Sequence, residues 1–273
     1  MANKPEYAII LDFEATCDDR EQPRPQEIIE FPSVILSLDT LETIDEFRAF
    51  VKPHHHPVLT DFCKTFTSIL QEDIDAAQPF MEVFTSHHNW LLKHGLTVEN
   101  SVFVSCGDWD LGTMLPAQCV ASVPGIELIP PVYLRWHNIK KSFCKIRNKE
   151  KAPGMAGMLK DLGLEIVGHH HCGIDDCRNI TELCRTLVHE GAQIEPTKKL
   201  SISKYPPITI QLRLGDRIEQ VKLGGRSMKA LIGIAGKTFK KSISGFTNKD
   251  GIQIKEDRDL LHLTPGEEIL VSE

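Results

Sequence analysis

Apolar runs of strand length alternate with segments of helical periodicity through most of the chain. Three strands come first, and helices and a further strand then alternate. This order predicts an α/β fold with a mixed sheet flanked by helices, in which the first strands are antiparallel and a later strand runs parallel to the first. The predicted strands are 7–15, 30–38, 46–51 and 102–105, with a turn at 39–42. The predicted helices are 79–94, 110–119, 155–162 and 175–189.

A shorter region of strand-like alternation follows a segment rich in Lys and Pro at 197–207. It begins with alternating apolar residues at 208–214 and a turn at Gly215-Asp216, after which a return strand and a helix capped by Ser227 are expected. Further short strands are predicted at 252–254, 260–263 and 268–271. Such a ββα unit followed by strands resembles a small α+β, β-grasp or ubiquitin-like module, a type of domain that usually binds proteins. We therefore expect two domains, 1–196 and 208–273, joined by a linker at 197–207.

Charge distinguishes the two predicted domains. Residues 1–196 carry 17 Lys and Arg against 29 Asp and Glu, a net of −12, whereas residues 197–273 carry 14 against 9, a net of +5. Within the acidic part, the run from Arg135 to Lys151 holds seven basic residues. This run fits either a surface that follows phosphates or an ordinary solvated face, and the positive second domain leaves RNA binding open there.

Composition excludes several classes of protein. With 41% hydrophobic and 25% charged residues the chain is typical of globular proteins, and its apolar runs are too short to span a membrane. The N-terminal residues lack the apolar run of a signal peptide, so we expect an intracellular protein of the cytoplasm or nucleus with no membrane partner. The eight cysteines form no C-x-x-C pair, and no disulfides are predicted.

Asp12 and Glu14 form an acidic pair on the first predicted strand. Because side chains alternate along a strand, both carboxylates leave one face while Phe13 enters the core. Like charges placed side by side raise each other's pKa unless cations lie between them, so the pair is a candidate site for divalent metal. Taken alone, an Asp-x-Glu pair is more often a solvated strand edge.

Two later motifs add acidic residues. Asp108 and Asp110 lie where a strand gives way to a helix, a usual place for ligands, and spacing alone leaves open which of them caps the helix and which binds metal. In the helix over 175–189, phasing places Asp176 on the apolar face and Asp175 on the polar one. An inward Asp176 can either bind metal or interact with the helix N-terminus. His171 lies five residues before it.

These motifs together resemble the DEDDh exonucleases, the superfamily that includes proofreading exonucleases and RNase T, and most closely the Eri-type 3′-to-5′ exoribonucleases. The resemblance extends over residues 5–196, and Thr67-Ser68-Ile69 departs from it because the family usually has glycine at the middle position. The residues that carry it are Leu11-Asp-Phe-Glu-Ala-Thr-Cys17, Gln26-Glu-Ile-Ile-Glu-Phe-Pro32, Asp61-Phe-Cys63, Gly107-Asp-Trp-Asp110, Asn138-Ile-Lys-Lys-Ser142 and His171-Cys-Gly-Ile-Asp-Asp176.

The resemblance implies an RNase H-like fold and two-metal phosphodiester hydrolysis. Two Mg²⁺ ions, or Mn²⁺ as a substitute, are expected between four carboxylates, and His171 is expected to act as the general base. RNA with a free 3′ end, single-stranded or as a duplex with a 3′ overhang, would be shortened to nucleoside 5′-monophosphates. The implied metal ligands are Asp12, Glu14, Asp110 and Asp176, supported by Asp108 and Asn179. The expected substrate contacts are Trp109, Phe62, Ala15, Thr16, Arg135, Lys140 and Lys141.

Two other functions remain open at this stage. A DNA-directed 3′-to-5′ exonuclease of the same fold is one, because no residue can be shown to recognise a 2′-hydroxyl. A catalytically silent RNA-binding adaptor is the other, although none of the five implied catalytic residues is replaced in this sequence. A protein partner is expected to bind the C-terminal domain.

Overall fold

The computed structural model describes residues 4–123, 125–201 and 204–273, which form two compact units. The first unit comprises Met1–Val123 and Pro130–Lys199, and the second comprises Pro124–Ile129 and Leu200–Glu273. The short segment before Pro130 thus belongs to the second unit, although the sequence pattern places it inside the first domain. Among the described residues, no helix has the length and apolar character needed to cross a bilayer.

The first unit is built on one mixed sheet with the strand order β5-β4-β3-β1-β6-β7-β8, and β2 also pairs with β3. Strands β1, β3 and β4 form an antiparallel meander, and β6 runs parallel to β1, so the predicted arrangement of the sheet is confirmed. Strand β7 is in turn parallel to β6. The strands are β1 Tyr7–Leu11, β2 Glu14–Ala15, β3 Ile28–Ser37, β4 Thr43–Lys52, β5 Gln78–Pro79, β6 Ser101–Ser105, β7 Arg135–Asn138 and β8 Lys198–Lys199.

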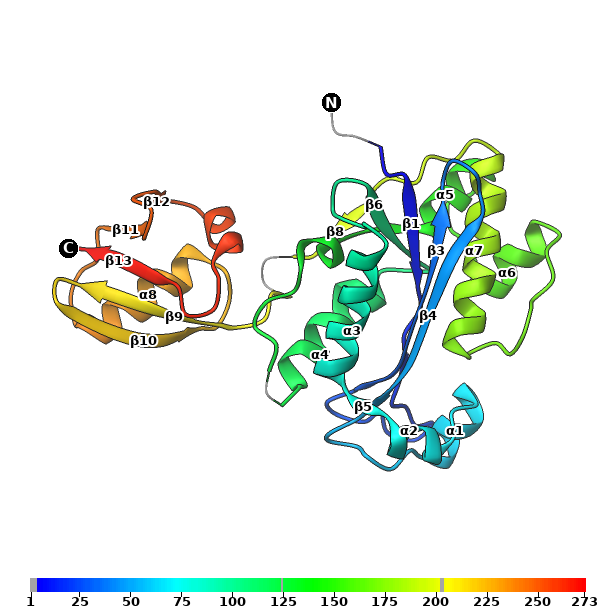
Figure 1. Ribbon diagram of the computed structural model, residues 1–273, viewed down its shortest axis with the longest axis horizontal. Helices are drawn as coiled ribbons and strands as arrows, with labels where there is room; N and C mark the ends of the chain where they lie inside the picture. The colour runs from blue at the N-terminus through cyan, green and yellow to red at the C-terminus, as the bar shows by residue number, and fades with distance from the viewer. Residues whose placement is uncertain (1–3, 124, 202–203) are drawn as a thin grey trace. The chain divides into compact units, whose positions relative to one another are not determined.

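Helices cover both faces of this sheet (Figure 1). Helices α3 and α4 lie on one face, and α5, α6 and α7 lie on the other, where the apolar sides of β1, β3 and β6 form a buried cluster with them. The largest of these helices is α7, whose apolar stripe includes Ile180, Leu183 and Leu187. The helices are α1 Asp61–Thr67, α2 Gln71–Ala76, α3 Phe80–Lys93, α4 Leu115–Ala121, α5 Ile139–Ile146, α6 Met155–Asp161 and α7 Gly173–His189.

The first predicted strand, 7–15, is wrong in one respect because it is broken after Leu11. Regular pairing with β3 stops there and resumes only at Glu14, with a bulge between Glu14 and Ala15. At the break, the N–H of Phe13 donates to Oδ1 of Asp110 at 3.0 Å instead of to a neighbouring strand. A side chain remote in sequence thus replaces a ladder hydrogen bond, which no local pattern could reveal.

Other differences from the sequence pattern are smaller. The predicted helix 110–119 consists of a π-helical turn, Asp110–Met114, followed by α4. Pro116 lies in the first turn of α4, where its missing N–H is tolerated. Lys198–Lys199, which the pattern assigns to a linker, form β8 and pair with β7. Short elements α1, α2, α5 and β7 were not predicted.

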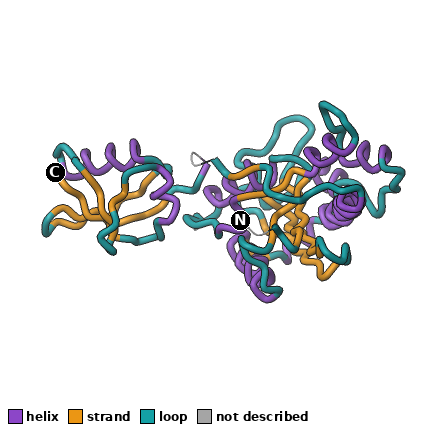
Figure 2. The backbone as a smooth tube through the Cα atoms, turned by 90° about the horizontal axis from the view of Figure 1, so that it is seen from above, coloured by secondary structure: helices purple, strands orange, loops and turns teal. Residues whose placement is uncertain are grey.

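The second unit has a mixed sheet with the order β10-β9-β13-β11-β12, covered on one face by α8 (Figure 2). Strand β13 is parallel to β9, and the other pairs are antiparallel. The Ser227 hydroxyl accepts from the Ala230 N–H, which provides the predicted helix cap. The strand predicted at 260–263 is wrong, because Asp257–His262 form a 3₁₀ helix. The elements are β9 Ile208–Leu214, β10 Arg217–Leu223, α8 Met228–Phe239, β11 Gly245–Asn248, β12 Gln253–Ile254 and β13 Glu268–Ser272.

Candidate active site

Three carboxylates from three different elements converge at the end of β1. Asp12 follows that strand, Glu14 lies on β2, and Asp176 lies in the first turn of α7. Ligand oxygens of the three lie within 4.8 Å of one another. Asp110, which begins the helical turn after β6, reaches the same place because its carboxylate accepts the Phe13 N–H between Asp12 and Glu14. The topology thus brings together all four carboxylates that the sequence singled out.

This cluster is buried and electrostatically costly. The exposed fractions of Glu14, Asp110 and Asp176 are 7%, 5% and 3%. Burial, and then repulsion from Asp12 and other neighbouring carboxylates, raise the pKa of Glu14 to about 10. Burial, and then repulsion from Asp110, raise the pKa of Asp12 well above its ordinary value. Burial raises the pKa of Asp110 to about 6. An all-oxygen cluster with this much repulsion has the donor set of a site for hard divalent cations, whose charge would offset it.

A fifth carboxylate, Glu30, fixes where α7 begins. Its side chain is fully buried, and one oxygen accepts the Gly173 N–H at 3.0 Å while the other accepts from Arg48 at 2.7 Å. A Cβ on Gly173 would approach the Asp12 carbonyl to 3.0 Å and Pro32 to 2.9 Å, so glycine is needed for this close approach. Glu30 therefore holds in place the start of the helix that carries Asp176. No role was predicted for Glu30 from the sequence, although an acid between apolar neighbours on a buried strand was a signal.

The loop before α7 brings two histidines to Asp176. His171 has a positive φ of 70°, which is uncommon for any residue but glycine, and its N–H donates to Asp176 at 2.9 Å. The Nδ1 atom of His170 lies 3.1 Å from the same carboxylate. Asn179 braces the loop, because its side-chain amide both donates to and accepts from the backbone of Val167 at 2.9 Å. His170 was not singled out from the sequence.

Aromatic rings line one side of this loop. The rings of Phe66 and His171 are stacked with their centroids 3.9 Å apart, and Phe62 stacks on Phe66 at 5.3 Å. Both phenylalanines come from α1, which begins with the Thr60 hydroxyl accepting the Cys63 N–H. Trp109, beside Asp110, is 40% exposed. The structure therefore places flat apolar surfaces next to the carboxylate cluster, and Phe66 was missed because α1 was not predicted.

A family model described as Exonuclease (RNase_T) matches residues 9–184, which cover the whole of this constellation. The chain belongs to this exonuclease family. Among solved structures, the nuclease domain of 3′hExo, a DEDDh family member bound to rAMP, is 32% identical with a TM-score of 0.66; the match covers 73% of this chain and 100% of that one. The first unit thus has the RNase H-like fold of these exonucleases, and membership implies divalent metal ions at the carboxylate cluster.

Two further proteins are similar to this chain over most of its length. Human ERI1 exoribonuclease 3 is 40% identical over 195 residues, which are 71% of this chain and 57% of that protein. The chain therefore spans little more than half the length of this relative. A 3′-exonuclease whose structure concerns 3′-end specific recognition of histone mRNA stem-loop is 29% identical with a TM-score of 0.66, and the match covers 80% of this chain and 92% of that one.

Among the described residues, the contacts of Asp108 lie outside the carboxylate cluster. Its Oδ1 accepts from the indole N–H of Trp136 at 2.9 Å and from the Asn138 amide at 3.0 Å, and Lys198 lies 4.0 Å from its other oxygen. Trp136 and Asn138 both belong to β7, and Asn138 also caps α5. Asp108 thus ties the strand end that carries Asp110 to the neighbouring strand.

The basic residues expected to contact substrate are separated by the fold. Lys140, in the first turn of α5, is close enough for its charge to oppose part of the rise in the pKa of Asp12 and Asp110 that burial causes. Lys141 is exposed beside it. Arg135 instead begins β7, at the end of the parallel strands opposite to the cluster. Of the three basic residues, Lys140 is therefore the one that the described interactions place beside the carboxylate cluster.

Ala15 and Thr16 lie directly beyond Glu14 and are both buried. The Thr16 hydroxyl accepts the Glu27 N–H at 3.0 Å, and the two backbones also pair, with the Thr16 N–H donating to the Glu27 carbonyl at 2.8 Å. The Ala15 carbonyl faces the Cys63 thiol at 3.9 Å. These contacts hold the β2 backbone rigidly beside the cluster, so the structure shows both residues in a supporting position.

Proposed function

We propose that this protein is a 3′-to-5′ exoribonuclease that hydrolyses phosphodiester bonds at RNA 3′ ends and releases nucleoside 5′-monophosphates. The observation that carries the proposal is the convergence of Asp12, Glu14 and Asp176 within 4.8 Å, with Asp110 bound to the peptide between the first two. Similarity to a nuclease domain solved with rAMP supports a substrate that is a nucleic acid end.

Asp12, Glu14, Asp110 and Asp176 would hold two Mg²⁺ ions, for which Mn²⁺ can substitute. When bound, such ions supply positive charge that activates water and stabilises the leaving 3′ oxygen. Glu30, which accepts the Gly173 N–H, holds the start of the helix that carries Asp176. Asn179 braces the loop that precedes this helix. The four carboxylates thus act as a unit, and removing any one leaves the others repelling.

His171 would accept the proton of the attacking water. Burial, and then the neighbouring His170, lower the pKa of its ring, which keeps the imidazole in the neutral form that accepts a proton. The stacking of Phe66 on His171 orients that ring, and the bond from the His171 N–H to Asp176 joins the loop to the carboxylate cluster. A positive φ at His171 fits a residue held in place for function.

Substrate would lie between the aromatic rings and the lysines. Trp109 and Phe62 are proposed to stack on bases at the 3′ end, with Phe66 extending the aromatic surface. Lys140 and Lys141 would neutralise phosphates, and the backbone at Ala15 and Thr16 would border the terminal nucleotide. Arg135 is not part of this proposal, because it lies at the opposite end of β7.

The test uses 5′-labelled RNA and a DNA of matched sequence, each incubated with the full chain and Mg²⁺ or with EDTA. We expect a ladder that shortens from the 3′ end of RNA, that is abolished by EDTA and that falls at least about a thousandfold in Asp176→Asn. Glu182→Gln is the matched control, since it removes a half-exposed acid from the same helix. Equal digestion of DNA would favour a DNA-directed exonuclease, and RNA binding without any Mg²⁺-dependent product would favour a silent adaptor.

We further propose that the second unit is a β-grasp, ubiquitin-like module that binds a protein partner. Its support is topological: a helix follows the first two strands, and the last strand runs parallel to the first in the centre of the sheet order β10-β9-β13-β11-β12. Because the proposed substrate is RNA, we also propose that the protein is located in the cytoplasm or nucleus. Imaging of the tagged full chain tests this location. Exclusive capture of RNA by the second unit would contradict the protein-binding role.

A further inference from the structure

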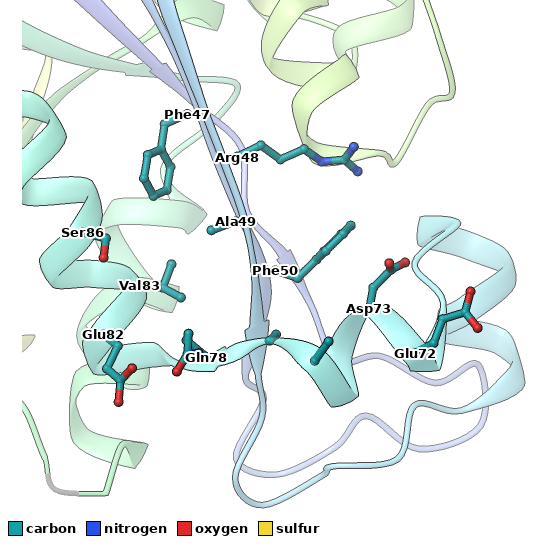
Figure 3. A pocket seen from close by; sticks show the side chains of 12 residues that line it. Phe47, Arg48, Ala49, Phe50, Glu72, Asp73, Gln78, Glu82, Val83 and Ser86 are labelled. Atoms are coloured by element: carbon teal, nitrogen blue, oxygen red, sulfur yellow. The ribbon is translucent and has the colours of Figure 1, made fainter.

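A groove of about 580 Å³ opens on the first unit, and none of the four clustered carboxylates is among the residues that line it (Figure 3). It is lined by the consecutive residues Phe47–Phe50 of β4 together with residues of α2, β5 and α3. Consecutive side chains of a strand leave opposite faces of the sheet. Figure 3 shows this alternation, with Phe47 and Ala49 on the side of α3 and Arg48 and Phe50 on the other side. A groove that meets all four therefore faces the edge of the strand.

The edge of β4 is unpaired along most of its length. Among the described residues, its outer side pairs only with the two residues of β5, at Val51 and Lys52. The N–H of Glu46 donates to the neighbouring Asp45 side chain at 2.9 Å, so it points away from β3. Backbone groups alternate in direction along an antiparallel strand, and Arg48 and Phe50 must therefore also present their N–H and C=O groups to the outer edge. An exposed edge of this kind accepts a further strand.

The side chains around the edge favour a positively charged occupant. Glu72 and Glu82 are exposed carboxylates on α2 and α3, and Asp73 lies beside Glu72. The single positive side chain in the lining, Arg48, is neutralised by Glu30 at 2.7 Å. Phe47 and Phe50 supply apolar floor on either side of the strand. Apolar floor with an acidic rim suits a segment in which apolar and basic side chains alternate.

We propose that this groove binds an extended, lysine- or arginine-bearing segment of a partner protein, which adds as a strand to the edge of β4. Main-chain hydrogen bonds to the edge would provide affinity, and the acidic rim would select for charge. RNA is disfavoured because Glu72, Glu82 and Asp73 repel phosphate. A second copy of the chain is disfavoured because pairing two β4 edges would bring two acidic rims together. The proposal does not depend on the nuclease chemistry.

The probe is a fluorescein-labelled peptide of about eight alternating lysine and valine residues, the length of an ordinary strand. Its binding to the full chain is followed by fluorescence anisotropy at low and high salt. One control peptide carries glutamate in place of lysine. Another keeps the lysines but is N-methylated at alternate residues, which removes the N–H groups that strand addition needs while leaving the charge unchanged. The second control separates strand pairing from simple charge attraction.

Two variants of the protein test the location. Glu72→Gln/Glu82→Gln removes two rim charges, and Ala76→Trp fills the groove from an exposed position on α2. Glu42→Gln/Glu165→Gln is the matched control, because it removes two exposed charges of the same unit outside the groove. None of these residues belongs to the carboxylate cluster, so retained nuclease activity and an unchanged thermal transition show that each variant is folded.

We expect saturable binding of the lysine peptide with a dissociation constant below about 1 mM, weakened by salt. Removing the two rim charges should weaken binding about fivefold, Ala76→Trp and N-methylation should each weaken it at least about tenfold, and the control pair should leave it unchanged. The proposal is overturned by equal binding of the N-methylated or glutamate peptide. It is equally overturned by an absence of saturation, by loss of affinity in the control pair alone, or by self-association of the chain that Ala76→Trp abolishes.

Discussion

The two units differ most in what they bury. The first unit encloses several ionisable side chains, among them Glu14, Glu30, Asp110 and Asp176, and most lie at one end of its sheet. In the part of the second unit that the structure describes, Arg226 is the one polar side chain buried to this degree. Burying a charged group is costly unless it is paired or binds a cation. A cluster of buried acids that repel one another is therefore the feature that separates a site from a scaffold.

Arg226 shows the other use of a buried charge. Its guanidinium donates to the carbonyls of Leu260 and Leu263 at 3.0 Å and to that of Glu127 at 3.2 Å. The Glu127 carboxylate in turn accepts the N–H and hydroxyl of Thr209. Every one of these partners belongs to the second unit. Arg226 thus donates to three backbone carbonyls and braces the segment at 125–129, whereas the acids of the first unit repel one another.

The largest effect that the contrast predicts is a loss of hydrolysis rate on substitution in the loop before α7, in the first unit. His171→Ala should lower the single-turnover rate of RNA hydrolysis about 10²- to 10⁴-fold, because a positioned general base contributes that much. His170→Ala is the matched control, since His170 also contacts Asp176 but is not expected to accept the proton. Its rate should fall less than about tenfold. The opposite order of effects would assign the base to His170, and equal losses would show that the loop only positions Asp176.

The next largest effect is on the stability of the second unit. Arg226→Met should lower the free energy of unfolding of that unit by about 3 kcal/mol, because three carbonyls lose a buried donor. Differential scanning calorimetry of the full chain should show one transition moving to lower temperature while nuclease activity at 25 °C is retained. Arg226→Lys keeps the charge but has fewer hydrogen-bond donors. Its transition temperature should lie between those of Arg226→Met and the unsubstituted protein. Loss of activity in parallel with the transition would mean that the site depends on the second unit.

Hydrophobic patterning was enough to predict the order of the main elements of the first unit. Helix α7 is long and amphipathic, so helical phase fixed the directions of Asp175 and Asp176, and in the structure Asp175 pairs with Arg178 while Asp176 faces the cluster. The pattern failed where single long-range contacts decide the backbone. The break at Phe13 depends on the Asp110 carboxylate, which is 97 residues away in the chain.

The candidate site was predictable in its acids but not in its surroundings. The motifs pointed to Asp12 and Glu14, helical phase favoured Asp176, and the family resemblance chose Asp110 over Asp108. The fold brings these four carboxylates together. Charge density alone could not decide the role of the basic run 135–151, because β7 and α5 send its ends in different directions and Arg147 and Lys149 form ion pairs with Glu190 and Asp161. A one-dimensional count of charge carries no information about which end of a strand a residue occupies.

Buried polar groups of the first unit also predict how its stability depends on pH. His87 is fully buried between the Tyr133 hydroxyl at 2.7 Å and the Ser33 hydroxyl at 2.9 Å, and burial lowers its pKa to about 3. The unfolded chain binds a proton near pH 6.5 whereas the folded chain does not, so the stabilisation is complete above pH 6.5 and is lost as pH falls toward 3. Between pH 7.5 and 5 the loss should be about 2 kcal/mol.

Urea unfolding of the full chain at several pH values measures this slope. His87→Gln should lose about 2 kcal/mol of the dependence between pH 7.5 and 5, since glutamine does not titrate. His189→Gln, at an exposed position at the end of α7, should leave the slope unchanged. A slope that persists in His87→Gln would show that other groups carry it and that His87 is protonated in the folded protein.

The smallest expected effect concerns the positive charge of the second unit. Lys222, Lys229 and Lys249 are exposed there, and replacing all three by glutamine should change the KM for RNA less than about twofold if that unit serves a protein partner. Lys140→Gln/Lys141→Gln in the first unit should raise KM about tenfold and reduce the dependence of binding on salt, because Lys140 lies beside the carboxylate cluster and Lys141 is exposed next to it in the chain. KM values of the triple and the double variant, measured at two salt concentrations, show which unit contributes more to RNA binding. A larger rise in KM in the triple variant than in the double variant would reverse the comparison, since RNA would then be bound mainly by the unit that lacks the acidic site.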